Sequence, residues 1–384
     1  MTKGENPFPS IPRLVDHYFL LILVGDGRDN PMALDFPLQV WKGAEGKPVL
    51  ILIHGLGATE KSWTNPYEEF LGKGKLSFDY VLADYLERPS PPYFSLGQHR
   101  NYCLSTPLRS LSSRPRPLWE IFKDRGYNLL TWTQSKPYGP IALAVEELNG
   151  IVAESEAIFG TGSPFIFIGH SRGGLVARKW IQDHPDKRNR IEGLILLACP
   201  NGGSRLANVG DFFARAVKTV GRFVPRELSL DGGRISLRLA AFYEELAELF
   251  RGVALEELRP HSAFIRRIKS GEPDEQRSRI RYLNLVATST VFTKLYRIST
   301  GEIGELKEVI SLIDSLPKMI PPMMLPDEIV NGKGDGLVSK ERARMAWIGP
   351  GSQKEFNINH LRMLIDADVR GEIFRFLESI GEQT

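Results

Sequence analysis

Short apolar runs that alternate with helical patterns are the feature that most limits what this chain can fold into. The runs occupy residues 48–54, 127–132, 164–169, 191–198 and 280–287, with a more polar one at 354–359. Helical patterns at 117–126, 141–159 and 173–184 separate several of them. Because strands buried on both faces have continuous apolar sequences, this alternation predicts a mostly parallel central sheet flanked by helices.

The two ends of the chain extend this pattern. Residues 17–24 and 36–41 suggest an antiparallel hairpin at the edge of the sheet. Residues 361–380 predict a final helix with one apolar face, formed by Ile365, Val369, Ile373 and Phe376.

Two stretches do not follow the alternation, residues 64–115 and residues 205–275. The first is rich in Pro, Ser, Tyr and Arg, and the second holds two amphipathic segments. No linker composition separates independent domains, so we expect one domain over residues 1–384 with these two insertions as a cap or lid.

Composition excludes several classes of protein. Of the residues, 42% are hydrophobic and 25% charged, as in a soluble globular protein, and a net charge of +3 is too small to indicate a nucleic-acid partner. The apolar run 18–24 is too short to span a bilayer, which makes a cytoplasmic location the default expectation. The two cysteines predict no disulfide framework: Cys199 resembles a buried free thiol, and Cys103 lies in a polar region.

Ser171 stands where an apolar run ends and a helical pattern begins, in the stretch GHSRG at 169–173. Glycines two residues to either side of a serine suit a sharp strand-to-helix turn, where larger side chains would collide. Ligands bind beyond the carboxyl ends of parallel strands. This context favours an exposed nucleophile over a plain glycine-rich turn.

A serine hydroxyl needs a base to accept its proton, and seven histidines compete for that role. His54 and His170 belong to glycine motifs in which we expect the backbone to matter more than the ring. His184 lies at a predicted helix end, within a DHPD sequence that indicates a cap and turn rather than a metal site. His360 follows the last strand at the same sheet edge as Ser171, so we predict that it is the base.

The base needs a carboxylate that orients it, and Asp335 in the stretch NGKGDGLVS lies between the last two predicted strands. The resulting chain order of Ser, Asp and His is the one expected for this arrangement. Asp335 could instead be an ordinary turn aspartate, and Asp211 is the weaker alternative for the acid.

An oxyanion hole completes the predicted site. Glycines in HGLG at 54–57 let the backbone approach a substrate carbonyl, so that the N–H of Leu56 can point at it. The N–H of Arg172, directly after the nucleophile, is the second predicted donor.

These motifs resemble those of an α/β-hydrolase of the lipase and esterase type. The resemblance runs from about residue 48 to the C-terminus without the insertions, and GHSRGGLVAR and LRPHSAFIRRI are similar to sequences of bacterial triacylglycerol lipases and lipase-like inositol deacylases of GPI anchors. It implies the α/β-hydrolase fold and ester hydrolysis through an acyl-enzyme. The excursion at 288–334 departs from many relatives, which place the acid almost directly after its strand.

The leading functional hypothesis is hydrolysis of a small-molecule or lipid ester with an apolar acyl group, without a metal or other cofactor. The amphipathic pieces at 205–250 and the Met- and Pro-rich 317–326 suit a cap that receives an acyl chain and that touches a lipid interface transiently, or equally an insertion packed on the core. Alternatives are an acyltransferase or thioesterase with the same triad, and a binding protein without turnover. The sequence does not define an oligomeric state.

If the cap covers an apolar cleft, Phe213, Val217 and Val220 should line it. Replacing both Val217 and Val220 with Ser should lower kcat/KM for long-chain esters more than for acetate or butyrate. The reason is that each buried methylene contributes about 0.8 kcal/mol only where apolar side chains receive it. A series of p-nitrophenyl esters measures this, and a uniform loss with a lower melting temperature would instead identify a structural segment.

Overall fold

The computed structural model describes part of the chain in full and five further strands by their backbone. The fully described residues are 37–66, 68–69, 116–207, 253–290 and 326–381, and the backbone strands are 80–85, 94–95, 101–105, 294–299 and 307–311.

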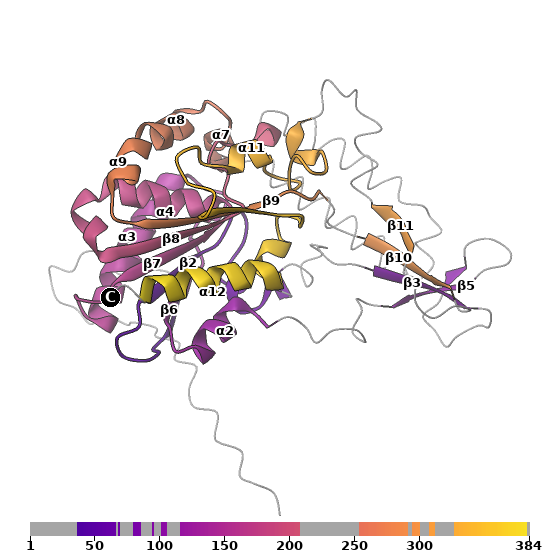
Figure 1. Ribbon diagram of the computed structural model, residues 1–384, viewed down its shortest axis with the longest axis horizontal. Coiled ribbons are helices and arrows are strands. Elements are labelled where there is room, and N and C mark those ends of the chain that lie inside the picture. The colour runs from indigo at the N-terminus through magenta and orange to yellow at the C-terminus, as the bar shows by residue number, and fades with distance from the viewer. Residues whose placement is uncertain are drawn as a thin grey trace, which may run out of the picture.

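Seven strands form the main sheet in the order β1-β6-β2-β7-β8-β9-β12 (Figure 1). Their bounds are β1 Leu38–Trp41, β2 Val49–Ile53, β6 Asn128–Trp132, β7 Phe165–His170, β8 Ile191–Leu197, β9 Arg281–Ala287 and β12 Gln353–Phe356. All neighbours are parallel except β1 and β6. The six predicted strands and an antiparallel edge strand at 36–41 are therefore confirmed, whereas residues 17–24 lie outside the described residues.

The sheet is buried on both faces, as its apolar strands predict. All five residues of β2 are fully buried. Val49, Ile51 and Ile53 join one core cluster, and Leu50 and Leu52 join the other. Because successive side chains of a strand point to opposite faces, each of the five central strands contributes to both cores.

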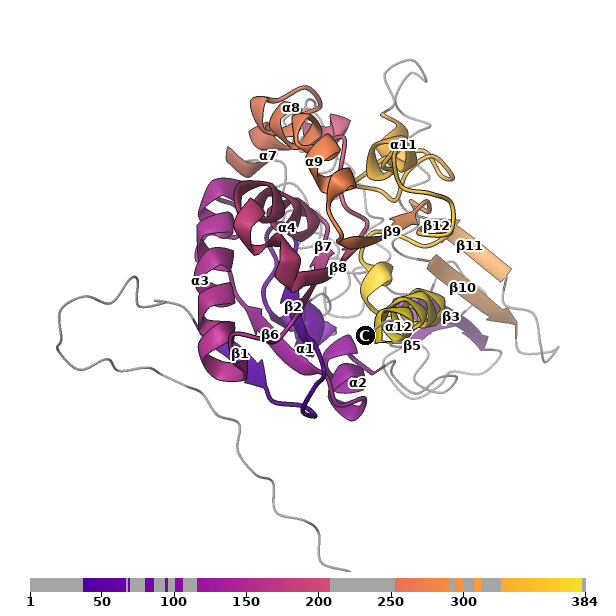
Figure 2. The same cartoon turned by 60° about the vertical axis from the view of Figure 1, so that its left-hand side comes forward.

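Helices cover both faces, which confirms the predicted layers (Figure 2). The helices α3 (Ile141–Phe159) and α4 (Arg172–Asp183) contribute to the first cluster, and α2 (Leu118–Asp124) and α12 (Ala367–Gly381) contribute to the second. Shorter helices are α1 Lys61–Thr64, α7 Val253–Glu257, α8 Ala263–Ser270, α9 Glu272–Arg277 and α11 Lys340–Ala343.

The final helix is shorter than the predicted range 361–380, so that prediction was wrong at its start. A 3₁₀ turn occupies Arg362–Leu364, and α12 begins only at Ala367. The Asp366 carboxylate accepts the N–H groups of Asp368 (2.9 Å) and Val369 (3.3 Å), which satisfies free donors at a new helix start. The predicted apolar face is nevertheless buried.

A second sheet, in the order β11-β10-β3-β5-β4, joins two distant parts of the chain. Strands β3 (Tyr80–Tyr85), β4 (Phe94–Ser95) and β5 (Asn101–Ser105) come from the first predicted insertion. Strands β10 (Lys294–Ser299) and β11 (Lys307–Ser311) come from the excursion after β9, and β10 pairs with β3 in parallel. The sequence patterns did not predict this sheet.

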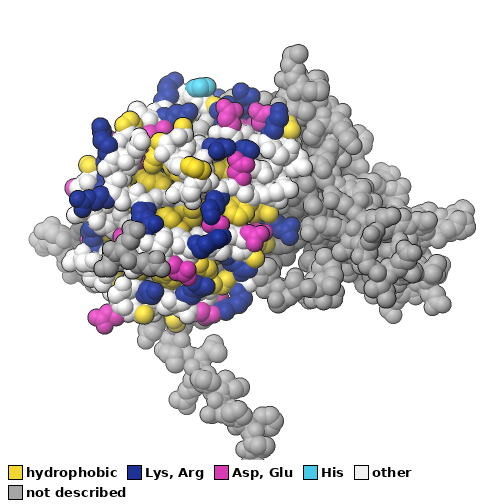
Figure 3. Space-filling model, viewed as in Figure 1, with side chains coloured by type: hydrophobic (Ala, Val, Ile, Leu, Met, Phe, Trp, Pro, Cys, Tyr) yellow, Lys and Arg dark blue, Asp and Glu magenta, His cyan; other side chains and the backbone are white. Residues whose placement is uncertain are grey.

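The described surface mixes charges of both signs. Figure 3 shows Lys and Arg side chains interspersed with Asp and Glu over the face that it presents. Among the described residues, none of the helices combines the length and the hydrophobicity that crossing a membrane requires.

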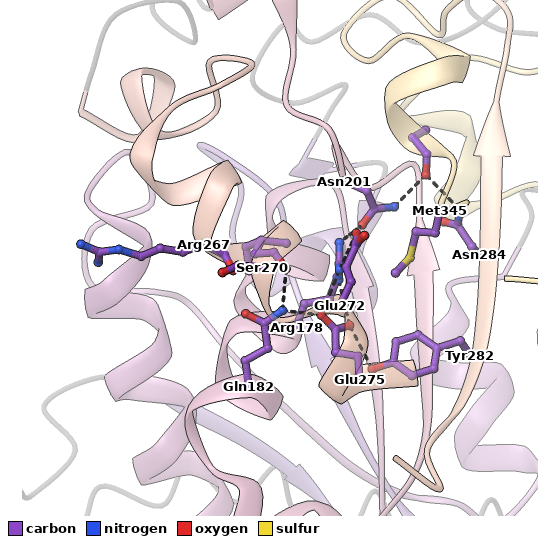
Figure 4. A network of polar contacts seen from close by, with 12 residues as sticks. Arg178, Gln182, Asn201, Arg267, Ser270, Glu272, Glu275, Tyr282, Asn284 and Met345 are labelled. Carbon is purple, nitrogen blue, oxygen red and sulfur yellow. Dashed lines mark hydrogen bonds and ion pairs between the residues drawn. The ribbon is translucent and has the colours of Figure 1, made fainter. Parts of the chain in front are cut away.

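A buried ionic network fixes α9 against α4 and β9 (Figure 4). The fully buried Arg178 donates to both carboxylate oxygens of Glu275, at 2.9 and 3.0 Å, and Tyr282 donates its hydroxyl to the same carboxylate at 3.0 Å. Burial opposes the charge of Arg178, yet the adjacent Glu275 leaves the guanidinium pKa above its ordinary value. The C-terminal part of the predicted insertion 205–275 is thus connected to the core by paired charges.

Replacing Glu275 with Gln should lower the free energy of unfolding by about 3–5 kcal/mol, because Arg178 would remain as a buried charge without its main partner. Glu272 contacts the same guanidinium at 3.1 Å, but its side chain is 27% exposed. Glu272→Gln should therefore cost only about 1 kcal/mol or less. Urea unfolding of both variants measures the difference, and equal losses would contradict this account.

Candidate active site

Ser171 lies in the turn between β7 and α4, at the carboxyl end of the central strand. Its backbone has φ 54° and ψ −128°, a left-handed conformation that is costly for a residue other than glycine. The Ser171 N–H donates to the Leu197 carbonyl of the next strand at 2.8 Å, and its own carbonyl accepts the Gly174 N–H at 3.0 Å. The predicted sharp strand-to-helix turn is therefore present.

The flanking glycines have separate steric reasons. A Cβ on Gly169 would lie 2.5 Å from backbone atoms of Gly174, across the turn. A Cβ on Gly173 would lie 2.2 Å from the carbonyl oxygen of Ile53, at the end of β2. Both distances are far below van der Waals contact, so the turn requires glycine at both positions.

Asp335 and His360 form a buried pair. The Nδ1 atom of His360 lies 2.7 Å from Oδ2 of Asp335, and both side chains are nearly inaccessible to solvent. The other carboxylate oxygen, Oδ1, accepts the N–H groups of Leu337 (2.9 Å) and Val338 (2.7 Å). Asp335 is thus both a turn aspartate and the partner of a histidine. Because the carboxylate accepts at Nδ1, that nitrogen carries the ring proton and Nε2 keeps its lone pair.

His170 lies beside His360 and supports it. The two ring centroids are 4.9 Å apart, and Nε2 of His170 donates to the His360 carbonyl at 3.0 Å. Burial, and secondly the neighbouring His360, lowers the pKa of His170 to about 3, so this ring is neutral at pH 7. Since residue 170 precedes Ser171, the contact brings the Asp335–His360 pair to the serine turn. No signal in the sequence indicated a role for this ring.

The alternative base, His184, lies at the opposite end of α4. Twelve helical residues separate it from the serine turn, a span of about 18 Å. Its ring stacks on Trp180 and its Nδ1 contacts the Trp180 carbonyl at 2.9 Å. Asp183, next to it, pairs with Lys179. Among the described residues, no cluster of His, Cys, Asp or Glu is arranged to hold a metal ion.

The predicted oxyanion loop adjoins Ser171. A Cβ on Gly55 would lie 3.0 Å from the Cβ of Ser171. Leu56 follows in a turn, and Gly57 has φ +64° and donates its N–H to the Pro137 carbonyl at 3.1 Å. The backbone of Leu56 therefore lies near the serine, and the backbone of Arg172 is adjacent to it in the chain.

Four predicted positions lie outside the described residues. These are Asp211, Phe213, Val217 and Val220. A hollow of about 630 Å³ between α3, α4, α7 and α8 is lined by Lys179, Asp183 and His184, among others. It thus lies at the far end of α4 from Ser171. Cys199 is a free, buried thiol, as predicted.

The chain belongs to the alpha/beta hydrolase family, whose profile matches residues 50–291. No curated protein matches the sequence.

Several solved structures are similar to this one. Bacillus licheniformis lipase BlEst2, in its mature form, is 14% identical, with 87% of this chain and 93% of that chain covered and a TM-score of 0.44. A structure from a study of carboxylesterases of the thaumarchaeon Nitrososphaera gargenis is 12% identical, with 92% and 98% covered and a TM-score of 0.42. A Paleococcus ferrophilus monoacylglycerol lipase is 12% identical, with 90% and 100% covered and a TM-score of 0.37.

Replacing Asp335 with Asn should lower kcat by about 10⁴-fold if His360 is the base, because the amide no longer holds the ring in the required tautomer. The melting temperature should change little, since the amide oxygen can still accept the two loop N–H groups. Asp327, in the same loop and paired with Lys333 at 3.5 Å, provides the matched control, and Asp327→Asn should keep full activity. Loss of activity in Asp211→Asn, with Asp335→Asn unaffected, would assign the acid to residue 211.

Proposed function

We propose that this alpha/beta hydrolase is a serine hydrolase that cleaves carboxylic esters through an acyl-enzyme, as an esterase or lipase. Ser171 is the nucleophile, His360 the base and Asp335 the orienting acid. The observation that carries the proposal is the buried Asp335–His360 pair, held beside a serine in a left-handed backbone conformation. A strained, half-buried serine next to an oriented imidazole is the arrangement that nucleophilic catalysis needs.

The chemistry follows from the ring's tautomer. The Ser171 hydroxyl oxygen attacks the ester carbonyl carbon while Nε2 of His360 accepts the hydroxyl proton. The tetrahedral intermediate collapses, the bond to the alcohol oxygen breaks, and His360 returns its proton to the leaving alcohol. A water molecule then attacks the acyl-enzyme by the same proton transfers, which releases the acid and restores Ser171.

Two backbone N–H groups, those of Leu56 and Arg172, stabilise the oxyanion of each tetrahedral intermediate. Support comes from the position of the Leu56 turn against Ser171 and from the start of α4 at Arg172. A helix N-terminus adds positive dipole character at this point. One such donor typically contributes about 3 kcal/mol to the transition state.

The substrate class in this proposal is an ester with an apolar or lipid-like acyl group. It is supported by the amphipathic pattern of residues 205–250 in the sequence. A thioesterase or an acyltransferase would use the same three residues. Product analysis in the presence of competing alcohols separates transfer from hydrolysis.

Replacing Ser171 with Ala should abolish labelling by a fluorophosphonate probe and lower kcat on p-nitrophenyl butyrate by on the order of 10⁵-fold or more, because the nucleophile is lost. His360→Ala should reduce kcat by a similar factor, since the residues of a triad act as a unit. The melting temperature of Ser171→Ala should stay close to that of the wild type, whereas kcat of His360→Ala is compared per folded molecule, because this variant leaves the buried Asp335 carboxylate without its ring partner.

The matched control is Ser270→Ala, because the Ser270 hydroxyl is exposed at the end of α8 and contacts only the Arg267 carbonyl among described groups. This variant should label and turn over like the wild type. Labelling that persists in Ser171→Ala would refute the assignment of the nucleophile. A wild-type protein that neither labels nor hydrolyses any ester would favour a binding protein without turnover.

A further inference from the structure

Arg172 carries a positive charge into the interior beside the serine turn. Its side chain is fully buried. Among the described residues, all of the acceptors that its guanidinium contacts are neutral: the Gln134 amide oxygen and the carbonyls of Pro137 (3.5 Å), Gly139 (2.8 Å) and Pro140 (3.3 Å). Burial lowers the pKa of Arg172 to about 10, which still leaves it charged at pH 7. A buried cation without a carboxylate in contact is costly, so its contacts call for an explanation.

The contact between Arg172 and the Gln134 amide oxygen connects Arg172 to the predicted oxyanion loop at 54–57. The Gln134 side-chain amide donates to the His54 carbonyl at 3.2 Å, and its backbone N–H donates to Nε2 of His54 at 2.9 Å. Nε2 is therefore the acceptor nitrogen, and Nδ1 of His54 carries the proton that it shares with the Gly55 carbonyl at 2.9 Å. Arg172, Gln134, His54 and Gly55 thus form one continuous buried chain of hydrogen bonds.

The contacts of Arg172 with the carbonyls of residues 137–140 connect it to the other end of the same loop. The Pro137 carbonyl accepts both the Arg172 guanidinium and the N–H of Gly57. The ring of Tyr138 covers Gly57 so closely that a Cβ there would lie 2.5 Å from it. The segment 134–140, held by Arg172, therefore fixes both ends of the turn that contains Leu56.

We propose that the Arg172 side chain is a positioning residue, which acts through Gln134 and the 137–140 carbonyls to hold the Leu56 N–H at the distance that the oxyanion requires. The inference rests on the proposed function of Ser171. It gives Arg172 two tasks, since its backbone N–H is a proposed oxyanion donor and its side chain sets the position of the other donor. Donors act at 2.7–3.1 Å, and a misplacement of about 1 Å costs roughly 100-fold in rate.

The sharpest variant is Gln134→Glu. A carboxylate would still accept from Arg172, and would pair with its charge, but it cannot donate to the His54 carbonyl. If Gln134 only satisfies the buried Arg172, this variant should be as stable and as active as the wild type. If the chain positions Leu56, kcat on p-nitrophenyl butyrate should fall by roughly 10–100-fold, with KM within about threefold and the melting temperature retained.

Arg172→Met tests the same chain from its other end, and Arg178→Met is the matched control. Arg178 is a second fully buried arginine of α4, but it contacts Glu275 and the groups around it rather than the segment 134–140. Arg178→Met should lower the melting temperature and leave kcat per folded molecule unchanged. Arg172→Met should lower kcat and weaken binding of a trifluoromethyl ketone, which forms an oxyanion on Ser171, by the same factor.

Three results would overturn the inference. In the first, folded Gln134→Glu and Arg172→Met both keep wild-type kcat and ketone affinity. In the second, kcat falls only in proportion to the folded fraction, as for a structural residue. In the third, wild-type protein shows neither ester hydrolysis nor fluorophosphonate labelling. This third result refutes the proposed function as well, whereas the first two results leave the proposed function intact.

Discussion

The close approach of Gly173 to the Ile53 carbonyl is the constraint on which the rest of the site depends. Only a residue without a Cβ lets the first turn of α4 lie directly on the end of β2. That contact forces the chain to turn within one residue after β7, so Ser171 takes a left-handed conformation. It also brings the loop after β2 against the serine. One steric condition therefore sets both the turn at Ser171 and the position of the loop after β2.

The second half of the site is held by hydrogen bonds rather than by sterics. The ring of His360 contacts the Asp335 carboxylate. The backbone N–H of His360 donates to the Asp335 carbonyl at 3.2 Å, and the backbone carbonyl of His360 accepts from the ring of His170. These three bonds come from two separate parts of the chain and leave the ring little freedom. If His360 is the base, as we propose, a ring fixed in this way loses little entropy on reaching the transition state.

The sequence predicted those parts of the fold and site that depend on local patterns. The five central strands were predictable because each is an apolar run with burial on both faces, and the sharp turn at Ser171 because its glycines are close in sequence. The contact between Asp335 and His360 was expected from their order relative to the strands, and their catalytic roles stay predictions. The contacts of Gln134 and His170 were not predictable, since they reach carbonyl groups 80 and 190 residues away. The delayed start of α12 was missed because Asp366 acts as a cap within an otherwise helical pattern.

The small second sheet joins the insertion at 64–115 to the excursion at 288–334 in a single unit. Strand β3 has β5 on one side and β10 on the other, and these partners come from distant parts of the chain. Removal of residues 294–311 would expose one side of β3, a row of unpaired N–H and C=O groups on which a strand of another molecule could assemble. Shortening or exchanging either excursion in an engineered variant, or in the course of evolution, therefore requires a matching change in the other.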